Sequence, residues 1–365
     1  MRIQSVRLRK VSLPLNVPFV THQAELKERP LIIIEVKDDA GHLGYGEVTA
    51  FPNPFYTYET LDTAWHILED YLIPSLLKNG AVHPSDFAIQ NESVQGHPMA
   101  KAGLEAALWD LYGKQEGKSL ADLLGGTRSS VSAGAVISLG DSLEKDVARL
   151  KAEGFQRYKL KVIKGREKEA IETLHEIDPE LPIMIDANGQ YNPEDMTHLC
   201  SLDDHGLTMI EQPFTAGDFY WHKKLQEEMN TPICLDESIM SFHDAVQAVE
   251  LGSCQIINIK ISRVGGLTAA VQIHDFCQSR GIPVWCGGMV ESGISKAHNL
   301  ALASLPNFTI PGDLSGSTRY FHKDLVHPEI VIRGGAIEVP QKAGMGINVD
   351  EEYLDEVTLV YDTFS

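Results

Sequence analysis

Short apolar runs that each end in a charged residue recur through the middle of the chain. The runs end at Lys161, Asp186, Glu211, Asp236 and Lys260, which are 25, 25, 25 and 24 residues apart. Buried parallel strands are near-continuous apolar runs, and a charge at the end of each run marks the change from strand to loop. One strand, one helix and two loops fill such a period, so the pattern predicts repeated βα units.

The same period extends in both directions along the chain. Residues 131–137 fit a strand before the five, and residues 282–286 and 308–310 fit two strands after them. Eight strands of this kind predict an α/β protein with a TIM-like (β/α)7β barrel. Active sites of such barrels lie at the C-terminal ends of the strands. We therefore expect the five charged residues to meet at one mouth.

The pattern outside the barrel is different. Residues 1–55 contain three segments with strand-like apolar runs and turn signals, and residues 58–124 contain helical spacing of apolar residues. This order predicts an α+β unit. We expect domains at 1–127, 128–320 and 321–365, with the last segment returning to the first domain.

Two loops of the first domain combine aromatic residues with proline, at 18–22 and 51–56. A loop of this composition is a stiff apolar surface. It is consistent with packing against the neighbouring domain or with a lid that keeps water from the barrel mouth. The residues alone favour packing.

Composition excludes several classes of partner. The formal net charge of −20 argues against binding to nucleic acid or to an anionic membrane. No apolar stretch approaches the roughly 18 residues of a membrane span, and the N-terminus lacks the core of a signal peptide. Five cysteines without a C-x-x-C pair indicate free thiols in a reducing cytoplasm.

Three carboxylates at the predicted mouth favour a divalent cation. Asp186, Glu211 and Asp236 offer only oxygen, which hard cations prefer, and crowded carboxylates repel each other without a cation. Magnesium fits best, with manganese as a substitute. One such residue commonly caps the next helix, but three at equal spacing after apolar runs argue against that explanation. Zinc is disfavoured because the chain has no H-x-H sequence.

Lysines flank the carboxylates on both sides. Lys159 and Lys161 share one face of a strand because side chains alternate, and Lys260 lies across the barrel. A nearby cation lowers the pKa of a lysine toward that of a usable base. A divalent metal beside two such bases suits removal of a proton α to a carboxylate, which gives an enediolate. We therefore expect a small anionic carboxylate as substrate.

This set of residues resembles the enolase superfamily, specifically its muconate lactonizing subgroup. The K-x-K motif, the D, E, D series and the lysine of the sixth strand are all present. Segments 263–266, 283–289, 291–293 and 303–313 resemble the branch that contains o-succinylbenzoate synthases and N-acylamino acid racemases. The resemblance covers essentially the whole chain and implies that the first domain caps the barrel.

The resemblance implies a role for each matching residue. Asp186, Glu211 and Asp236 bind magnesium, Lys161 is the base on one face, and Lys260 is the cation or acid on the other. Lys159 helps to neutralise the enolate. The loops at 19–22 and 51–56 close over the substrate, which raises the lid explanation above packing. The substrate-binding residues implied are Asn188, Arg263, Gly287, Gly288, Met289, Phe19 and Phe55.

Two activities within this branch remain open. The first is syn-dehydration of 2-succinyl-6-hydroxy-2,4-cyclohexadiene-1-carboxylate in menaquinone biosynthesis, and the second is racemisation of N-acylamino acids. Arg263 is typical of the branch that hosts the racemases, so both activities in one protein are an alternative. Dipeptide epimerisation and lactonisation are disfavoured by the segments at 287–289 and 291–293. A non-catalytic barrel is disfavoured because the lysine and carboxylate set is intact. We also expect a homo-oligomer.

Overall fold

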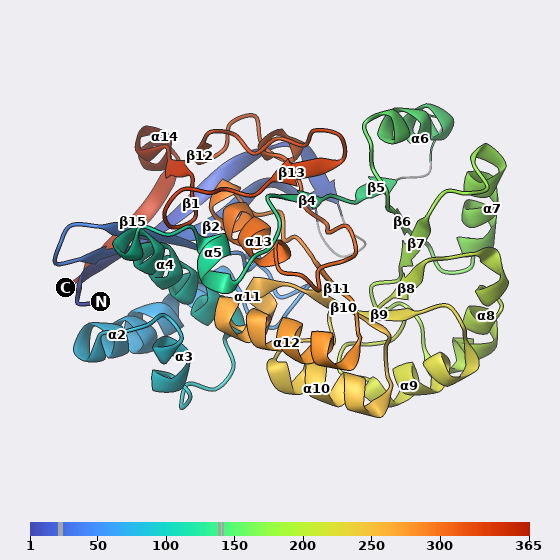
Figure 1. Ribbon diagram of the computed structural model, residues 1–365, viewed down its shortest axis with the longest axis horizontal. Coiled ribbons are helices and arrows are strands. Elements are labelled where there is room, and N and C mark those ends of the chain that lie inside the picture. Colours follow the sequence, from blue (N-terminus) through green and yellow to red (C-terminus); the bar gives the residue numbers. More distant parts are fainter. Residues whose placement is uncertain (21–24, 138–139, 141) are drawn as a thin grey trace.

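The computed structural model describes residues 1–20, 25–137, 140 and 142–365. These residues form an antiparallel sheet with helices beside a barrel of parallel strands (Figure 1). Residues 18–20 of the aromatic loop predicted at 18–22 belong to a strand instead, and residues 21 and 22 lie outside the described residues. The backbone of Phe19 pairs with Leu26, but its side chain is not among the described groups.

Four antiparallel strands form the sheet of the first domain, in the order β15-β1-β2-β3. They are β1 (Ile3–Val20), β2 (Glu25–Asp38), β3 (Leu43–Val48) and β15 (Thr358–Phe364). Because β15 pairs with β1, the two ends of the chain lie in one sheet (Figure 1). The predicted contribution of the C-terminal tail to the capping domain is confirmed, while the residue bounds of the domains stay a prediction.

Strand β2 is apolar at every position of its centre because both of its faces are covered. Leu31, Ile32, Ile33 and Ile34 are all fully buried. Successive side chains of a strand point to opposite faces. Ile32 and Ile34 pack in the core of the capping domain, whereas Leu31 and Ile33 join the core that extends into the barrel. The sheet therefore separates the helices of the capping domain from the barrel.

Helices of the capping domain pack on this sheet. They are α1 (Leu61–Ile67), α2 (Ile73–Asn79), α3 (Asp86–Gln90), α4 (Pro98–Glu116) and α5 (Leu120–Leu124), with a π-helical turn at Leu68–Leu72. A Cβ on Gly46 of β3 would lie 2.0 Å from the carbonyl oxygen of Gly103 in α4. Glycine at this position therefore allows the close contact between strand and helix.

Seven parallel strands form the barrel sheet in chain order. They are β5 (Ala135–Ile137), β6 (Tyr158–Lys161), β7 (Ile183–Asp186), β8 (Met209–Glu211), β9 (Ile233–Leu235), β10 (Ile256–Ile259) and β11 (Val284–Cys286). The register places Lys161 beside Asp186, and Asp186 beside Glu211. The charged residues that are equally spaced in the sequence are thus direct neighbours across three adjacent strands.

The strand predicted at 131–137 is divided in two. Its first part, β4 (Ser130–Ser132), pairs with β13 (Ala336–Glu338), and only β5 joins the barrel sheet. Gly134 lies at the break, where a Cβ would be 2.0 Å from a guanidinium nitrogen of Arg157. The apolar pattern did not show this break because both parts are short and partly buried.

The eighth strand predicted at 308–310 is reduced to single bridges in the structure. Phe308 pairs with Val284 of β11, and Gly312 pairs with Ala133 just before β5. These parallel bridges lie on opposite sides of the segment and so connect the last barrel strand to the first. The fold class predicted from the sequence is confirmed, with a shorter closing strand than expected.

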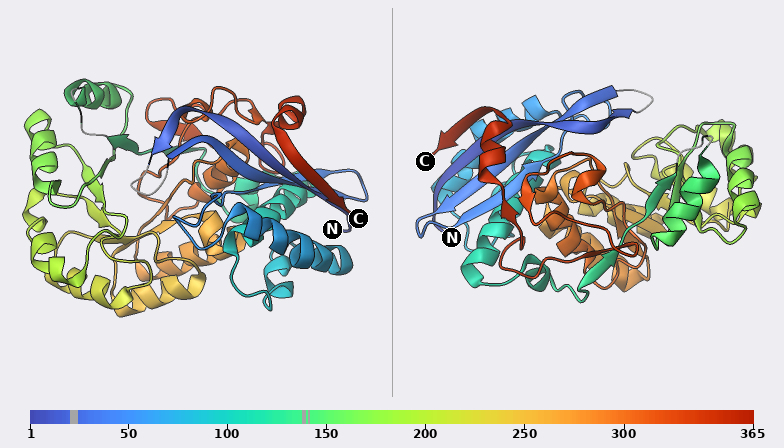
Figure 2. Two further views of the ribbon diagram at one scale, coloured as in Figure 1. Left: turned by 180° about the vertical axis from the view of Figure 1, so that it is seen from behind. Right: turned by 90° about the horizontal axis from the view of Figure 1, so that it is seen from above.

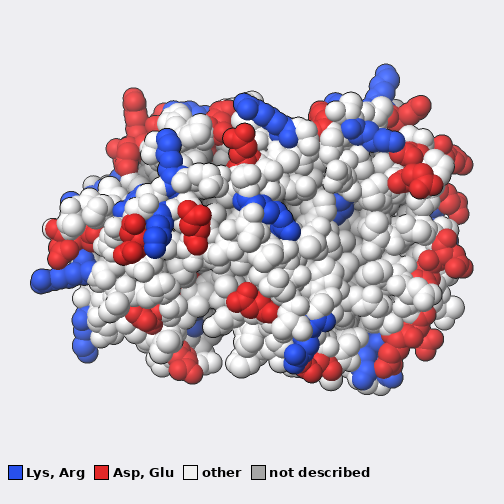
Figure 3. Space-filling model, viewed as in Figure 1, with Lys and Arg blue, Asp and Glu red and all other residues white. Residues whose placement is uncertain are grey.

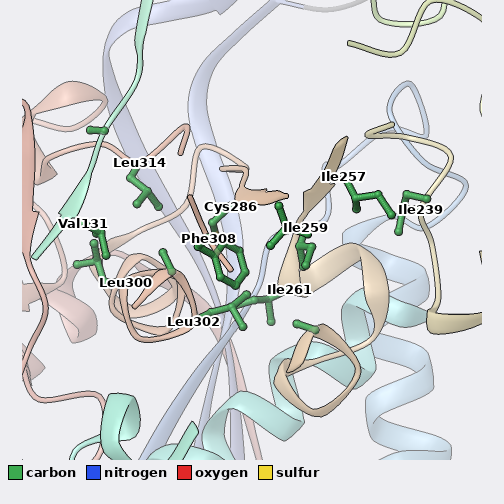
Figure 4. Packing of buried hydrophobic residues seen from close by; sticks show 14 of the residues in the cluster. Val131, Ile239, Ile257, Ile259, Ile261, Cys286, Leu300, Leu302, Phe308 and Leu314 are labelled. Atoms are coloured by element: carbon green, nitrogen blue, oxygen red, sulfur yellow. The ribbon is translucent and has the colours of Figure 1, made fainter. Parts of the chain in front are cut away.

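Helices surround the outside of the barrel as an arc (Figure 2). They are α6 (Leu143–Ala152), α7 (Glu167–Ile177), α8 (Met196–Cys200), α9 (Phe219–Glu228), α10 (Phe242–Leu251), α11 (Ile261–Val264), α12 (Leu267–Arg280) and α13 (Gly293–Ala303). Between strands and helices lies a continuous apolar core to which Ile257, Ile259 and Phe308 contribute (Figure 4). Three 3-10 turns occupy Pro193–Asp195, Asp203–His205 and Ser317–Arg319.

The remaining C-terminal elements run along the barrel and back to the capping domain. They are β12 (Val326–His327), β14 (Asn348–Val349) and α14 (Glu351–Glu356). Acidic side chains gather along one edge of the face shown in Figure 3, over the helices α7 to α9. In the part of the chain that the structure describes, no helix is long and apolar enough to cross a membrane.

Candidate active site

The charged residues predicted to meet at the mouth lie at the ends of five successive strands. Lys161, Asp186 and Glu211 are the last residues of β6, β7 and β8. Asp236 and Lys260 directly follow β9 and β10. Because all five strands are parallel, these residues share the same end of the barrel.

Lys159 lies among three buried or partly buried carboxylates. Its Nζ is 2.7 Å from Glu211 Oε2, 2.9 Å from Asp313 Oδ2 and 3.0 Å from Asp186 Oδ2. Burial alone would lower the pKa of Lys159, but the carboxylates outweigh it and raise the pKa well above the usual range. Lys159 is therefore held as a cation, as its position in the K-x-K motif suggested.

A second cluster surrounds Asp236. Lys260 Nζ is 2.9 Å from Asp236 Oδ2, and Arg263 is 2.6 Å from Asp236 Oδ1. Burial would raise the pKa of Asp236, but Arg263 and Lys260 outweigh it and lower the pKa. The hydroxyl of Tyr56 accepts hydrogen bonds from Lys260 (2.7 Å) and from Arg263 (2.9 Å). The capping domain thus contributes a side chain to this cluster.

Lys161 is in a different environment from Lys159 two residues earlier. Tyr158 and Leu160 point into the apolar core, so the two lysines share the opposite face of β6. Lys159 is buried, whereas Lys161 is exposed at the end of the strand. No ion pair joins Lys161 to a carboxylate of the described residues. Its amine is therefore accessible to a molecule at the mouth.

Two residues with unusual backbone conformation fix the loops that follow the carboxylates. Gln212 has a φ of 41°, and its buried side chain accepts from the N–H groups of Asp236 (3.0 Å) and Ser238 (3.2 Å). Asn188 has a φ of 44° and donates from Nδ2 to Glu237 Oε1 at 3.1 Å. Such conformations persist only where surrounding contacts hold them. The loops after β7, β8 and β9 are therefore linked to one another.

The segment after β11 approaches the second cluster through glycine. A Cβ on Gly287 would lie 2.6 Å from Lys260 Cε, and a Cβ on Gly288 would lie 2.7 Å from the carbonyl oxygen of Asp313. Glycine at 287 therefore leaves room for the Lys260 side chain, and glycine at 288 allows the close approach of the Asp313 backbone. Met289 is buried in the core of the capping domain, so its side chain serves packing.

The aromatic loop 51–56 packs on the capping domain and also reaches the mouth. The rings of Phe51 and Phe55 lie 4.7 Å apart; Phe51 belongs to the core of the capping domain, and the partly buried Phe55 packs against that core. Tyr56 at the end of the loop contacts Lys260. The two explanations derived from the sequence, packing and lid, are therefore compatible for this loop.

The carboxylates have the chemistry of a cation site. Glu211 Oε2 and Asp236 Oδ1 are buried and accept no hydrogen bond of good geometry from the described residues. The positive partners of the carboxylates are the lysines and the arginine described above. In that part of the chain, no group of three or more His, Cys, Asp or Glu side chains has the spacing of a metal site. The donor set of Asp186, Glu211 and Asp236 nevertheless fits a hard divalent cation, because all its atoms are oxygen.

Several residues of the site were not predicted from the sequence. Asp313 and Asn258 contact the first cluster, the latter by donating to Glu211 Oε1 at 3.0 Å. Arg157 lies beneath Lys159 and forms an ion pair with Asp313. A signal for Asp313 existed, because it lies three residues after the eighth predicted strand and ends the segment 303–313. Arg157 precedes its strand, where the periodic pattern gives no functional signal.

Comparison with known proteins identifies both domains. Residues 3–125 match the family model of the mandelate racemase / muconate lactonizing enzyme N-terminal domain, and residues 142–353 match the enolase C-terminal domain-like model. An o-succinylbenzoate synthase of Bacillus subtilis (strain 168) is 46% identical over 365 residues, which cover 100% of this chain and 98% of that protein. An N-succinylamino acid racemase of Amycolatopsis sp is 40% identical over 362 residues, or 98% of each chain.

A solved structure agrees with these matches. A member of the enolase superfamily from Listeria innocua Clip11262 superposes with a TM-score of 0.97 at 40% identity, covering 100% of this chain and 99% of that one. The resemblance inferred from the K-x-K motif and the spaced carboxylates is thereby confirmed. The chain belongs to the enolase superfamily, with the paired domains of the mandelate racemase and muconate lactonizing enzymes.

Proposed function

We propose that this protein is a magnesium-dependent o-succinylbenzoate synthase. Its reaction is the syn-dehydration of 2-succinyl-6-hydroxy-2,4-cyclohexadiene-1-carboxylate, a step of menaquinone biosynthesis. The observation that carries the proposal is the accessible amine of Lys161 on one side of the mouth, across from the buried Lys260 with its carboxylate partner. Relatives named o-succinylbenzoate synthase at 41–46% identity support it.

In this proposal each lysine has its own task. Lys161 removes the proton α to the substrate carboxylate, which gives an enediolate. The C–O bond to the ring hydroxyl then breaks, and Lys161 returns the proton so that water leaves and the ring becomes aromatic. Lys260 stays a cation on the other face, and Lys159 offsets the negative charge. Asn188, Arg263 and the backbone of 287–289 orient the substrate.

Asp186, Glu211 and Asp236 would hold Mg²⁺, for which Mn²⁺ can substitute, and the bound ion supplies positive charge that favours the enediolate. The substrate is then a small anionic carboxylate, which the local cations attract against the net charge of −20. Five free cysteines support a place in the reducing cytoplasm. A homo-oligomer and lid closure by Phe19 and Phe55 stay part of the proposal.

Racemisation of N-acylamino acids is a second candidate function. Two relatives named N-succinylamino acid racemase are 40% and 37% identical to this chain. That reaction needs proton transfer on both faces of the α carbon, and the two lysines lie on different sides of the mouth. The same site therefore suits both activities.

Proton exchange in deuterated water separates the tasks of the lysines. We expect Lys161→Ala to lose α-proton exchange for one enantiomer of N-succinylphenylalanine and Lys260→Ala to lose it for the other, as followed by NMR. Lys161→Ala should also lose almost all dehydration activity, whereas Lys260→Ala should keep a measurable part because one base suffices for a syn-elimination. Lys164→Ala is the matched control, since Lys164 is an exposed residue paired with Asp195.

Three outcomes bear on the assignment. Dehydration by the wild type with exchange of neither enantiomer would leave the synthase as the function and exclude the racemase. Unchanged rates in both lysine variants would show that neither is the base. Absence of both activities in the magnesium-loaded wild type would exclude the proposed function itself.

A further inference from the structure

The backbone of Val290 is strained. Its φ is 58°, in the left-handed region, where a β-branched residue is a genuine outlier. Val290 is buried and follows the glycine segment that passes over Lys260. Strained residues of this kind persist only where neighbouring contacts hold them, and they are concentrated at functional sites. Neighbouring contacts must therefore hold Val290 in this conformation.

Two buried side chains hold the peptide units around Val290. Arg29 donates from Nε to the carbonyl oxygen of Val290 at 3.1 Å and from a terminal nitrogen to that of Met289 at 3.3 Å. The carboxylate of Glu291 accepts from the backbone N–H of Met289. Arg29 belongs to β2 of the capping domain, so one of the two holders comes from outside the barrel.

Arg29 also holds the start of the aromatic loop. Its remaining N–H groups donate to the carbonyl oxygens of Ala50 (2.9 Å), Pro30 (3.0 Å) and Thr49. All five donors of the guanidinium thus have main-chain acceptors. The guanidinium lies 4.3 Å from the centre of the Phe51 ring, and that ring contacts the tilted ring of Phe55. One side chain therefore connects the loop that ends at Tyr56 with the segment after β11.

The burial of Arg29 is costly. The side chain is fully buried, and burial lowers its pKa to about 10, although Glu47 and Glu291 oppose the shift. A buried charge that bonds only to carbonyl groups is disfavoured relative to an apolar residue of similar size. Simple packing of two domains does not require such a buried charge. A fixed geometry between the loop 51–56 and the segment after β11 does require it.

We propose that Arg29 is a positioning residue for the reaction: it holds Val290 in its strained conformation and fixes the loop 51–56 against the same segment. The backbone of Gly287 and the hydroxyl of Tyr56 both contact Lys260, and Arg29 sets their relative position. The inference rests on the proposed function only in taking Lys260 as part of the site. Its structural part stands independently.

The test combines a substitution that removes the hydrogen bonds of Arg29 with a substitution that relieves the strain at Val290. Arg29→Lys keeps the charge but removes the planar set of donors. We expect it to lower kcat by at least about tenfold, because the energetic cost of one strained residue corresponds to a rate change of that size. The change in KM should be smaller. Adding Val290→Gly should recover at least about threefold of kcat, because glycine adopts a positive φ without strain. Val290→Gly alone should keep near-wild-type kcat.

A matched control and a second measurement complete the test. Val331→Gly, at an exposed valine without a positive φ, should give no recovery in the Arg29→Lys background. Hydrogen exchange of the peptides spanning 287–293 and 49–56 should be faster in Arg29→Lys than in the wild type. This readout needs no substrate, so it remains informative even where neither proposed activity is found.

Specific results would overturn the proposal. Wild-type kcat and unchanged exchange in Arg29→Lys would show that Arg29 positions nothing. Equal recovery by Val331→Gly, or no recovery by Val290→Gly, would reduce Arg29 to a general packing residue. If Arg29→Lys does not fold, Glu291→Ala removes the acceptor of the Met289 N–H and so releases the same segment from its other side. Loss of kcat in Glu291→Ala with recovery by Val290→Gly supports the strained segment, and wild-type kcat in Glu291→Ala overturns it.

Discussion

The two sides of the barrel mouth are held in place by different parts of the molecule. On the side of β6 and β7, the barrel holds itself: buried Glu167 accepts from the N–H of Gly165 (2.8 Å), from the Tyr191 hydroxyl and from His198 (3.1 Å). On the side of β10 and β11, the capping domain provides the carboxylates. Glu105 accepts from the N–H of Thr268 at 3.1 Å, and Glu47 accepts from Ser292 at 3.0 Å.

The pKa values of the buried glutamates are shifted in opposite directions on the two sides. Burial would raise the pKa of Glu167, but hydrogen bonds from Tyr191 and from the backbone outweigh it and lower the pKa. For Glu105 burial dominates and raises the pKa to about 7, and the same holds for Glu47. On the barrel side, hydrogen bonds therefore compensate for the burial of Glu167. On the side of the capping domain, the burial of Glu105 and Glu47 is not fully compensated.

Substitution of a carboxylate that lies between the two sides should cause the largest loss of activity. Glu211→Gln replaces one of three charged oxygen donors with a neutral amide and should lower activity by more than the roughly 100-fold that loss of an outer partner costs. It should also weaken Mg²⁺ binding in calorimetry, while the fold remains. Glu250→Gln, at a surface pair with Arg280 on the barrel, is the control. Full turnover of the wild type in excess chelator would exclude the metal.

The hydroxyl of Tyr56 should give the next largest effect. Tyr56→Phe removes the acceptor of Lys260 and Arg263, and a hydrogen bond to a charged group contributes about 1.5–3 kcal/mol, so kcat/KM should fall roughly 10- to 100-fold. Tyr191→Phe is the matched change on the barrel side. It should lower stability and leave kcat/KM within a few-fold. Equal kinetic loss in both variants would remove the distinction between the two sides.

The sequence predicted the barrel side of the site better than the side of the capping domain. Equal spacing places Lys161, Asp186 and Glu211 on adjacent strands because the period of a βα unit fixes where each strand ends. Contacts such as Tyr56 with Lys260 join residues 204 apart in the chain and leave no periodic signal. Glu105 likewise lies in helix α4, most of whose residues are buried, so its position in the helix does not distinguish it and only the docked domain shows what it binds.

The pH dependence of stability should give the clearest difference in sign between the two sides of the mouth. A glutamate whose folded pKa is raised stabilises the fold most below its unfolded pKa of about 4.5, and the contribution falls as the pH rises toward about 7. The wild type should therefore lose stability relative to Glu105→Gln between pH 5 and 8, by an amount of the order of 3 kcal/mol or less. Urea unfolding at both pH values measures it.

Glu167→Gln should show the opposite trend because the folded pKa of Glu167 is lowered. The contribution of this carboxylate is present above about pH 4.5 and is lost as the pH falls through the folded pKa. The wild type should therefore exceed Glu167→Gln in stability at pH 8, and the difference should shrink toward acid pH. Glutamine keeps the shape of both side chains, so the trends isolate charge. If the two variants followed the same pH dependence, the capping domain and the barrel would hold the mouth by the same means, because Glu105 would then be as well satisfied as Glu167.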